Sequence, residues 1–289
     1  MAVCAAGEAT VQHKKGSHSG SESMKVGDIM TTDLVCVKES DLMTHARQVL
    51  RDNHLHGLPV LNDNGSVLGM LDDQDILRIK SNKSDVTVRG YIRETPLITP
   101  ETDVREAAKL LLQARQHRCA VVRSSTDRTI VGIISDKDIL RNAHISKMEP
   151  KTISCIMNTR VLTAYPDDSI AKIWGNMLEW DFSGIPVISH EDEAMGIITR
   201  SDIIKAGFAR IRDRSGDMHS TGSGDSPKVE RLMSTPLYSI SPETTISKAI
   251  EALNHHDVGR ICVTNDKKIV GLVDRFTMLK ECVEGFGYL

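Results

Sequence analysis

The chain has 289 residues, 40% of them hydrophobic and 26% charged, which is typical of a globular protein with two domains of about 150 residues. Its formal net charge of −3 gives no chain-wide attraction to nucleic acid or acidic lipid. Aromatic residues make up 3%, too few for a surface that stacks the bases of a single strand. No stretch approaches the roughly 18 consecutive apolar residues of a membrane helix. The composition therefore favours a cytoplasmic protein without membrane contact.

The six cysteines are scattered and form no C-x-x-C pair. Three of them, Cys36, Cys119 and Cys262, lie in apolar runs that are typical of strands. We therefore expect buried free thiols in a reducing compartment, in preference to a disulfide framework. The histidine pairs at 54–56 and 255–256 lack the further ligands that a metal site requires, so no metal is expected.

Residues 1–23 are predicted to form a disordered tail, which makes Met24 a candidate for the functional start. From there one pattern recurs four times, at intervals of about 60 to 75 residues. It consists of a short segment ending in Met or Ile, a strand, an amphipathic helix, two strands and a second helix. The segments end at Met30, Ile92, Met157 and Met233, and the third strands contain Gly69, Gly132, Gly196 and Gly271. Because both landmarks keep the same register, the chain is predicted to contain four copies of one α/β unit.

The units are predicted at residues 24–82, 83–145, 150–212 and 228–284, with a flexible Gly- and Ser-rich loop at 213–227. The connection at 146–151 is short, so we expect the two halves to lie close together. The first helix of each unit shows one apolar face. In the second unit Thr102 or Asp103 is placed to cap this helix, and in the fourth Thr244 precedes it.

The sequences G-I-I-S-D-K-D-I-L at 132–140 and G-I-I-T-R-S-D-I-I at 196–204 make the pattern specific. With them, residues 24–283 resemble four CBS domains, as found in stand-alone CBS proteins of archaea and bacteria. The resemblance implies β-α-β-β-α repeats that pair into two Bateman modules. It further implies that the modules form a disk with clefts for adenosine-type ligands.

Ser135 with Asp138, and Thr199 with Asp202, lie where a strand leads into a helix. One interpretation is helix capping, in which the hydroxyl accepts a backbone N–H and the acid complements the helix dipole. The other is ligand binding, because a helix N-terminus with a hydroxyl suits phosphate and a carboxylate accepts ribose hydroxyls. The resemblance assigns the hydroxyls to phosphate and the acids to ribose.

The first and fourth units depart from this motif. Asp72 replaces the hydroxyl in the first unit, and the fourth unit has Asp274 at that position and Thr277 in place of the ribose acid. An aspartate caps a helix well but repels phosphate. We therefore predict one competent nucleotide cleft per module. A neutral or cationic adenosyl ligand, such as adenosine or S-adenosylmethionine, would tolerate the acidic clefts better.

His117-Arg118, just before the second strand of its unit, resembles the His-Arg pair that holds phosphate in the γ subunit of AMP-activated kinase. Arg260 occupies the equivalent place in the fourth unit, whereas the first and third units carry Gly57 and Gly184. Each module therefore has one arginine available for phosphate, with an exposed ion pair as the alternative role. The remaining residues of the predicted nucleotide site are Gly132 and Gly196 of the motif and, as walls for adenine, Leu97, Val161, Ala120 and Pro186.

A basic stretch follows the third unit's motif and comprises Arg200, Lys205, Arg210, Arg212 and Arg214. We interpret it as a solvated helix end, with contact to RNA or the ribosome as the less favoured interpretation.

The leading hypothesis is a non-enzymatic regulator, because no P-loop, GxGxxG or Ser/His/Asp arrangement is present and the repeats use almost the whole chain. Its implied ligand is AMP, ADP or ATP, no other cofactor is expected, and ligand binding is coupled to an unidentified protein partner. Two alternatives stay open. One is a scaffold that docks on a kinase, transporter or ribosomal particle, with ligand binding secondary; the other is a sensor of S-adenosylmethionine. Whether the disks form homodimers is also left open.

Overall fold

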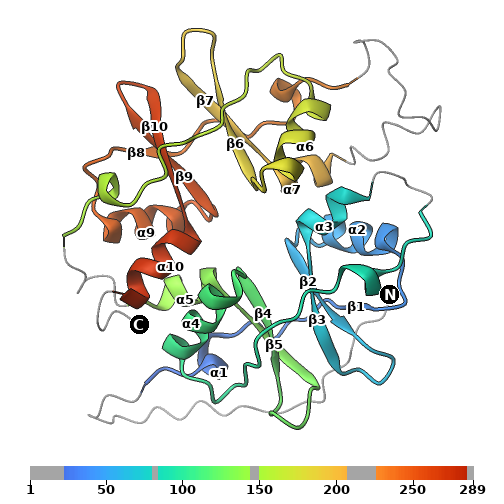
Figure 1. Cartoon of the computed structure of the whole chain (residues 1–289). Coiled ribbons are helices and arrows are strands. Elements are labelled where there is room, and N and C mark those ends of the chain that lie inside the picture. Colours follow the sequence, from blue (N-terminus) through green and yellow to red (C-terminus); the bar gives the residue numbers. More distant parts are fainter. Residues whose placement is uncertain (1–22, 80–83, 144–149, 207–225, 285–289) are drawn as a thin grey trace.

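The computed structural model describes four stretches of chain, residues 23–79, 84–143, 150–206 and 226–284, and each is one α/β unit. The four units, numbered 1 to 4 along the chain, form a ring (Figure 1). Units 1 and 2 are called module 1, and units 3 and 4 module 2. Most of the expected tail at 1–23, most of the expected loop at 213–227 and most of the connection at 146–151 lie outside the described residues.

The units share one order of elements. Unit 1 consists of α1 (Val26–Ile29), β1 (Val37–Lys38), α2 (Met43–Asp52), β2 (Gly57–Leu61), β3 (Val67–Asp72) and α3 (Asp73–Arg78). Unit 2 consists of the 3₁₀ turn η1 (Val88–Tyr91), α4 (Val104–Ala114), β4 (Arg118–Val122), β5 (Ile130–Ser135) and α5 (Asp136–Asn142). Unit 3 consists of η3 (Ile153–Cys155), α6 (Ile170–Glu179), β6 (Gly184–Ile188), β7 (Ala194–Thr199) and α7 (Arg200–Lys205). Unit 4 consists of η4 (Val229–Arg231), β8 (Ser239–Ile240), α9 (Ile246–His255), β9 (Arg260–Asn265), β10 (Lys268–Asp274) and α10 (Arg275–Glu284).

Each unit is built on an antiparallel hairpin, which pairs β2 with β3, β4 with β5, β6 with β7 and β9 with β10. All four hairpins shift register at the same place, after the fourth residue of the first strand. A short parallel strand, β1 or β8, joins the hairpin in units 1 and 4. In units 2 and 3 this strand is reduced to the single parallel bridges Ile98–Val121 and Ala164–Val187. The shared irregularity confirms that the chain repeats one fold four times.

The first helix of each unit begins at a polar cap. Asp103 caps α4 by accepting the N–H of Arg105 at 2.8 Å, which decides between the two candidates in that unit. In unit 4 the cap is Thr245, one residue later than predicted. The reason is that the carbonyl of Thr244 already accepts the N–H of Ile153 from unit 3, which holds Thr244 outside the helix.

The leading turn of every unit crosses to the other unit of its module. Val26 of α1 donates its N–H to Thr102 of unit 2, and Val88 of η1 donates to Asp41 of unit 1. Module 2 repeats the exchange, because Ile153 of η3 bonds to unit 4 and Val229 of η4 bonds to Asp168 of unit 3. The two units of a module are therefore interlocked.

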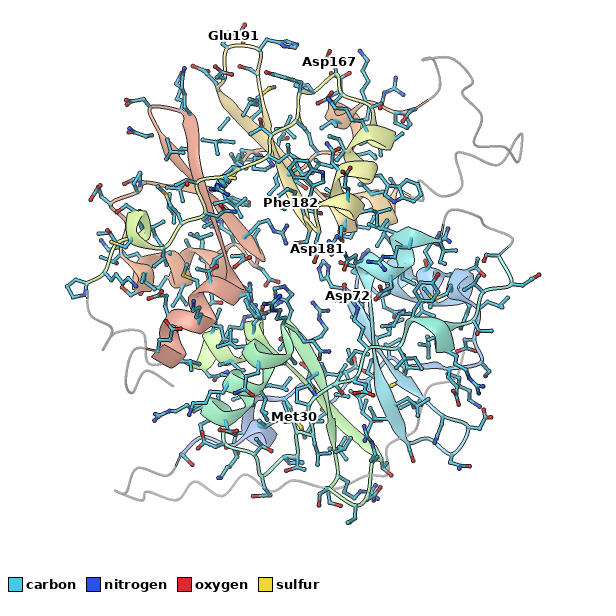
Figure 2. The ribbon with its side chains drawn as sticks, in the orientation of Figure 1. Met30, Asp72, Asp167, Asp181, Phe182 and Glu191 are labelled. Carbon is cyan, nitrogen blue, oxygen red and sulfur yellow. The ribbon has the colours of Figure 1, made fainter. Side chains whose placement is uncertain are left out.

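This exchange also explains the two landmarks of the repeat. Met30 packs on Gly132 of the β4–β5 hairpin (Figure 2), and Met157 packs on Gly271. Ile92 and the Arg93 backbone cover Gly69 in the same way. Gly196 faces the Ser234 backbone. A side chain at any of these glycines would collide with the crossing segment, so the glycine and the segment end occur together.

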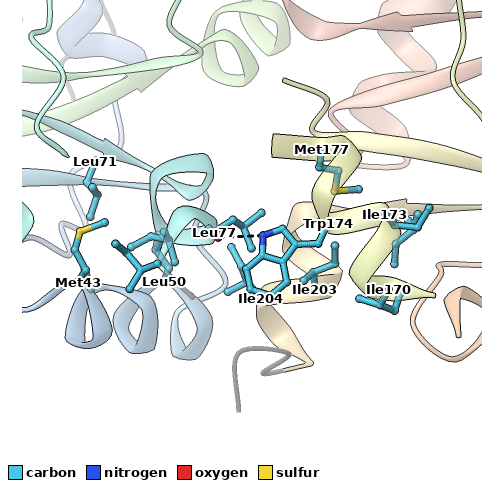
Figure 3. Close-up of a cluster of buried hydrophobic side chains, with 14 of the residues drawn as sticks. Met43, Leu50, Leu71, Leu77, Ile170, Ile173, Trp174, Met177, Ile203 and Ile204 are labelled. Atoms are coloured by element: carbon cyan, nitrogen blue, oxygen red, sulfur yellow. Dashed lines mark hydrogen bonds between the residues drawn. The ribbon is translucent and has the colours of Figure 1, made fainter. Parts of the chain in front are cut away.

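The hydrophobic core runs between the modules. One cluster joins unit 1 to unit 3, with Leu50 and Leu77 on one side and Ile173 and Ile203 on the other (Figure 3). A second cluster joins unit 2 to unit 4. We call the contacts of unit 1 with unit 3 and of unit 2 with unit 4 the two seams between the modules. Trp174 Nε1 donates a hydrogen bond of 3.0 Å to the carbonyl of Leu77 across the first seam. A smaller cluster, with Leu61 and Ala120, lies within module 1. The two larger clusters each join one unit of each module, and the expected α/β disk of two paired modules is confirmed.

Cys119, Cys262 and Cys282 are buried, and burial raises the pKa of each thiol to about 12. Cys36 is half-buried and Cys155 is exposed. Within the described ranges, none of the helices combines the length and the apolar character that a membrane crossing requires.

Candidate ligand-binding site

The motif of unit 2 forms a complete capping box at the start of α5. Asp138 Oδ2 accepts the Ser135 N–H at 2.9 Å and the Ser135 hydroxyl at 2.6 Å. The N–H of Asp138 donates back to Ser135 Oγ at 3.3 Å. Among the described residues, Asp138 Oδ1 makes no hydrogen bond. The capping interpretation therefore holds, and it leaves one carboxylate oxygen available to a ligand.

Unit 3 repeats the box at the start of α7. Asp202 Oδ2 accepts the Thr199 N–H at 2.8 Å and the Thr199 hydroxyl at 2.6 Å. The second oxygen, Asp202 Oδ1, accepts a long hydrogen bond of 3.5 Å from Ser234 Oγ of unit 4. The two motifs that the sequence singles out thus have the same internal geometry.

In unit 1 the position of the ribose acid is already engaged. Arg93, from the segment of unit 2 that covers Gly69, binds both carboxylate oxygens of Asp75 at 2.8 and 2.9 Å. The same guanidinium also donates to Gln74 Oε1 at 2.9 Å. The cap, Asp72, accepts the N–H of Gln74 at 3.2 Å. A ligand in this cleft would have to displace a bidentate ion pair, which is a second reason to place nucleotide elsewhere.

Unit 4 has the same box with the residue types exchanged. Asp274 Oδ1 accepts both the N–H and the hydroxyl of Thr277 at 2.8 Å. The carboxylate therefore lies at the cap and the hydroxyl one turn later, which is the reverse of units 2 and 3.

Arg118 and Arg260 each extend over a glycine of the other unit in their module. The Arg118 side chain fills the space beside Gly57 of β2, and the Arg260 side chain fills the space beside Gly184 of β6. Within the described part of the chain, neither guanidinium makes a hydrogen bond or an ion pair within 4 Å. Burial lowers the pKa of Arg260, and the charges of Asp274 and Asp73 oppose that shift. The alternative role of these arginines, an exposed ion pair, is not what the structure contains.

Strand register places each arginine between two caps. Arg118 is the direct cross-strand partner of Ser135, and Gly57 is the partner of Asp72. Directly opposite residues of an antiparallel pair lie on the same face with neighbouring side chains. Arg118 therefore lies near the hydroxyl cap of unit 2 and, through Gly57, near the acidic cap of unit 1. By the same register, Arg260 lies near Asp274 and near Thr199.

His117 points to a different neighbour from Arg118, since adjacent strand residues face opposite sides. Its Nδ1 lies 2.7 Å from Asp136 Oδ2, and its ring meets the edge of Phe276 of unit 4 at 5.3 Å between centroids. Burial opposes protonation of His117, but the hydrogen bond and charge of Asp136, with the charge of Asp274, outweigh it and raise its pKa. The two side chains of the predicted His-Arg pair therefore have different contacts. His117 contacts Phe276 of the other module, whereas Arg118 lies beside Ser135.

A buried ion pair closes the seam between units 1 and 3. Arg200 Nη2 donates to Asp181 at 2.7 Å, and its Nη1 lies 3.4 Å from Asp73 of unit 1. His56 Nδ1 lies 3.4 Å from the other oxygen of Asp73. Burial alone would raise the pKa of Asp73, but hydrogen bonds from His56 and Asp72 and the charge of Arg200 hold it below its usual range. Figure 2 shows Asp72 and Asp181 near the centre of the ring.

The seam between units 2 and 4 uses the equivalent residues. Arg275 Nη2 lies 3.4 Å from Asp257 Oδ1, and Lys137 and Arg141 of α5 reach the same oxygen at 2.7 and 3.3 Å. The hydrogen bond from Lys137 and the surrounding cations lower the pKa of Asp257.

Sequence reasoning missed these seam contacts and misassigned Arg200. Arg200 is 6% exposed and tied to two aspartates, so it is not part of a solvated basic stretch. Lys205 is exposed, and Arg210, Arg212 and Arg214 lie outside the described residues. An alignment of the four units would have shown the signal, because the residue after the cap is Asp in module 1 and Arg in module 2.

The expected adenine walls are not brought together. Ala120 is 2% exposed and packs on Leu61 and Val67 inside module 1, where it offers no surface to a ligand. Pro186 is likewise buried within β6. Leu97 is exposed but lies in the segment that leaves β3 of unit 1, after the Met70–Arg93 bridge, on the side of the Asp75 cleft.

Val161 follows Asn158, which forms a bridge with Leu272 of β10 in unit 4. Val161 is therefore on the side of the acidic cap Asp274. The segments that border the two capping boxes are those after the Thr31–Ile133 and Ile197–Ser234 bridges, which sequence reasoning did not single out. Gly132 and Gly196 are explained by the crossing segments, since units 1 and 4 contain the same glycine without the motif.

Among the described residues, no group of three or more His, Cys, Asp or Glu side chains is placed to hold a metal ion. His56 instead contacts Asp73, and His256 stacks on Tyr238 at 4.0 Å between ring centroids.

Comparison with known proteins gives the same arrangement. Protein MJ1404 of Methanocaldococcus jannaschii is 26% identical over 265 residues, covering 88% of this chain and 61% of that protein. The chain therefore spans less than two thirds of that relative. The crystal structure of MJ1225 from the same organism, a proposed archaeal homologue of γ-AMPK, superposes with a TM-score of 0.72 at 20% identity and covers 89% of this chain and 99% of that one.

A crystal structure of a conserved protein from Pyrococcus horikoshii has a TM-score of 0.60 at 18% identity and covers 90% of this chain and 100% of that one. At these identities the two structures establish the fold. The CBS domain model matches residues 26–82, 88–144, 153–209 and 229–284. The chain therefore belongs to the CBS-domain family and contains four CBS domains.

Proposed function

We propose that this protein is a non-enzymatic regulator that binds one adenine nucleotide, AMP, ADP or ATP, in each module. The observation that supports this most is a pair of arginines whose guanidinium groups make no hydrogen bond or ion pair within 4 Å among the described residues. Arg118 is the strand-register partner of the hydroxyl cap Ser135. Arg260 is the register partner of Asp274 and lies over Gly184, whose own partner is the hydroxyl cap Thr199. A planar, permanently charged fork of N–H donors suits a phosphate group.

The nucleotide in module 1 binds with its phosphate at Arg118 and Ser135 and its ribose at Asp138. Asp138 Oδ2 remains in the capping box, and the free Oδ1 accepts the ribose hydroxyls. In module 2 the corresponding residues are Arg260, Thr199 and Asp202. The long hydrogen bond from Ser234 to Asp202 Oδ1 is weak enough for a ribose hydroxyl to replace it.

Regulation follows from where the nucleotides bind. In module 2 the phosphate site combines Arg260 of unit 4 with Thr199 of unit 3, so a phosphate there adds a bond between units. In module 1 both Arg118 and Ser135 belong to unit 2, and Arg118 lies over Gly57 of unit 1. A ligand shifts an equilibrium only through unequal affinity for two states. Tightening one module changes the seams with the other, and through them the surface that a protein partner contacts.

Titration calorimetry with AMP, ADP, ATP and S-adenosylmethionine tests the proposal. We expect the nucleotides to bind and the variant R118A/R260A to bind them about 10- to 100-fold more weakly, because a hydrogen bond to a charged group is worth about 1.5–3 kcal/mol. R78A, which removes an exposed arginine at the end of α3, is the matched control and should bind as the wild type does.

Absence of binding of all four compounds to the folded wild-type protein would reject the proposal. Binding of S-adenosylmethionine that is tighter than that of the nucleotides, and unchanged in R118A/R260A, would replace the nucleotide with a neutral or cationic adenosyl ligand.

A further inference from the structure

The two modules differ in the residue that follows the acidic cap. In unit 1 the cap Asp72 is followed by another carboxylate, Asp73, whereas in unit 4 the cap Asp274 is followed by Arg275. The main-chain geometry at this point is the same, since Asp73 donates its N–H to the carbonyl of His56 and Arg275 to that of Gly259. The difference between the modules is therefore one of charge.

Asp72 has fewer partners than its counterpart. It accepts one hydrogen bond, from the Gln74 N–H at 3.2 Å, whereas Asp274 accepts two from Thr277 at 2.8 Å. Asp72 is also half-buried, so solvent compensates little for its charge.

The charged groups around Asp72 come from five parts of the chain. Asp73 lies beside it on α3, and Arg118 approaches from β4 over Gly57. Arg93, from the segment before α4, is committed to Asp75. On its far side, Asp73 contacts His56, before β2, and forms an ion pair with Arg200 of α7. Arg118, whose charge acts on Asp72, has no ion-pair partner within 4 Å among the described residues; Arg260, whose charge acts on the neighbouring Asp73, also has none there.

We propose that Asp72 competes with the nucleotide's phosphate for Arg118, so that module 1 takes up a proton at Asp72 when it binds nucleotide, whereas module 2 binds without such uptake. This inference rests on the proposed function and adds a pH control to one of its two sites. A phosphate at Arg118 removes the cation that supports the Asp72 carboxylate and adds a second anion beside it. Both effects favour the neutral acid.

The electrostatics of the free protein agree with this assignment. Burial, followed by the charge and hydrogen bond of Asp73, raises the pKa of Asp72 to about 6, while Arg118 opposes the shift. Phosphate binding therefore acts on a carboxylate whose proton affinity is already close to neutral pH. In module 2, Arg275 occupies the place of the second carboxylate, and Asp274 accepts two hydrogen bonds from Thr277.

Calorimetry of AMP binding at pH 7 in two buffers of different ionisation enthalpy measures the proton uptake. R260A leaves module 1 as the phosphate site, and R118A leaves module 2. We expect R260A to take up about half a proton or more per AMP in excess of the uptake by R118A. The variant D72N/R260A should lose that excess and bind AMP about tenfold more tightly than R260A at pH 7.

D72N/R260A also corrects for protons taken up by AMP itself, whose phosphate titrates near pH 6. D274N/R118A is the matched control in module 2, and its proton uptake should equal that of R118A. Equal uptake by R260A and D72N/R260A, with AMP bound by both, would overturn this inference and leave the proposed function standing.

Absence of AMP binding to the wild-type protein, in contrast, would reject the proposed function. Circular dichroism tests whether the D72N variant folds. If it does not, the comparison of R260A with R118A decides, because both retain Asp72, and equal uptake by the two would overturn the inference.

Discussion

Module 1 and module 2 have the same backbone plan but opposite charges where they meet. Directly after the cap of the second helix, both units of module 1 have an aspartate and both units of module 2 have an arginine. Each of these residues has a partner within its own unit, a histidine in module 1 and an aspartate with left-handed backbone in module 2. The residues concerned are Asp73 with His56, Asp136 with His117, Arg200 with Asp181 and Arg275 with Asp257.

This difference shows where repeated units are free to diverge. The glycines of the third strands are the same in all four units because each faces the crossing segment of its own module. The residues after the cap face the other module, and there the two modules are complementary. If module 1 paired with a copy of itself, Asp73 would meet aspartate, and buried like charges are costly. The charge pattern therefore favours pairing of the two different modules.

The largest expected effect comes from making the two sides of one seam alike. Arg200→Asp places a third carboxylate beside Asp73 and Asp181 in a buried site. Breaking a buried pair in this way costs about 3–5 kcal/mol of the free energy of unfolding. Urea denaturation measures it, followed by the fluorescence of Trp174, which lies at this seam. Trp180 is exposed and is replaced by Phe in all variants so that it does not contribute.

The double variant D73R/R200D is the control, because it reverses the direction of the pair without changing its composition. We expect it to recover at least half of the stability lost in R200D. A loss below 1 kcal/mol in R200D would mean that the seam does not depend on charge, and the contrast between the modules would then have no energetic meaning.

The sequence predicts the units well because the information lies within each unit. Alternating apolar strands, the capped helix at Val104 and the recurrent glycine follow from local periodicity and steric limits. The capping boxes at Ser135 and Thr199 were readable for the same reason, since their partners are three residues away.

The residue contacts at the seams could not be predicted from the sequence, because the residues that form them are far apart in the chain. Asp73 and Arg200 belong to different modules, and no periodicity in the sequence predicts that unit 1 packs on unit 3. The position of Ala120 was missed for a related reason. An apolar strand residue can face a ligand or another sheet, and only the packing of the two hairpins of module 1 decides that it is buried.

A stabilising effect of intermediate size is expected from removing the Asp72 carboxylate of module 1, which accepts a single hydrogen bond from Gln74. Asp72→Asn keeps a side chain that can cap α3 and removes a carboxylate whose pKa is raised to about 6 in the folded protein. Because the folded state binds the proton more tightly than the unfolded chain, ionisation opposes folding. D72N should therefore be about 1–3 kcal/mol more stable than the wild type at pH 7.5.

The sign of this effect fixes its pH window. The advantage of D72N should be absent below about pH 4, grow between about pH 4 and 6, and stay constant above. Thermal unfolding across this range measures it. Asp274→Asn, at the equivalent cap of module 2, should show no gain in the same window. A gain of equal size in D274N would show that the caps of the two modules are electrostatically alike.

The smallest effect is expected at the seam between units 2 and 4. Lys137 is 37% exposed and its partner Asp257 is 53% exposed, and Asp257 keeps Arg141 and Arg275 when Lys137 is removed. Lys137→Ala should therefore cost about 0.5 kcal/mol at low salt and nothing measurable at 1 M salt, because exposed ion pairs are weak and screened. Urea denaturation of K137A at both salt concentrations measures this.

The control is K172A, which removes an exposed pair between Lys172 and Asp168 within unit 3. K137A and K172A should agree within about 0.5 kcal/mol, since neither lysine is buried. A loss above 2 kcal/mol in K137A alone would mean that Asp257 depends on Lys137 to neutralise its charge. Both seams would then rely on charge to the same degree, although Arg200 forms ion pairs with an aspartate of each module, Asp73 and Asp181, whereas Arg275 forms one with Asp257 of its own unit.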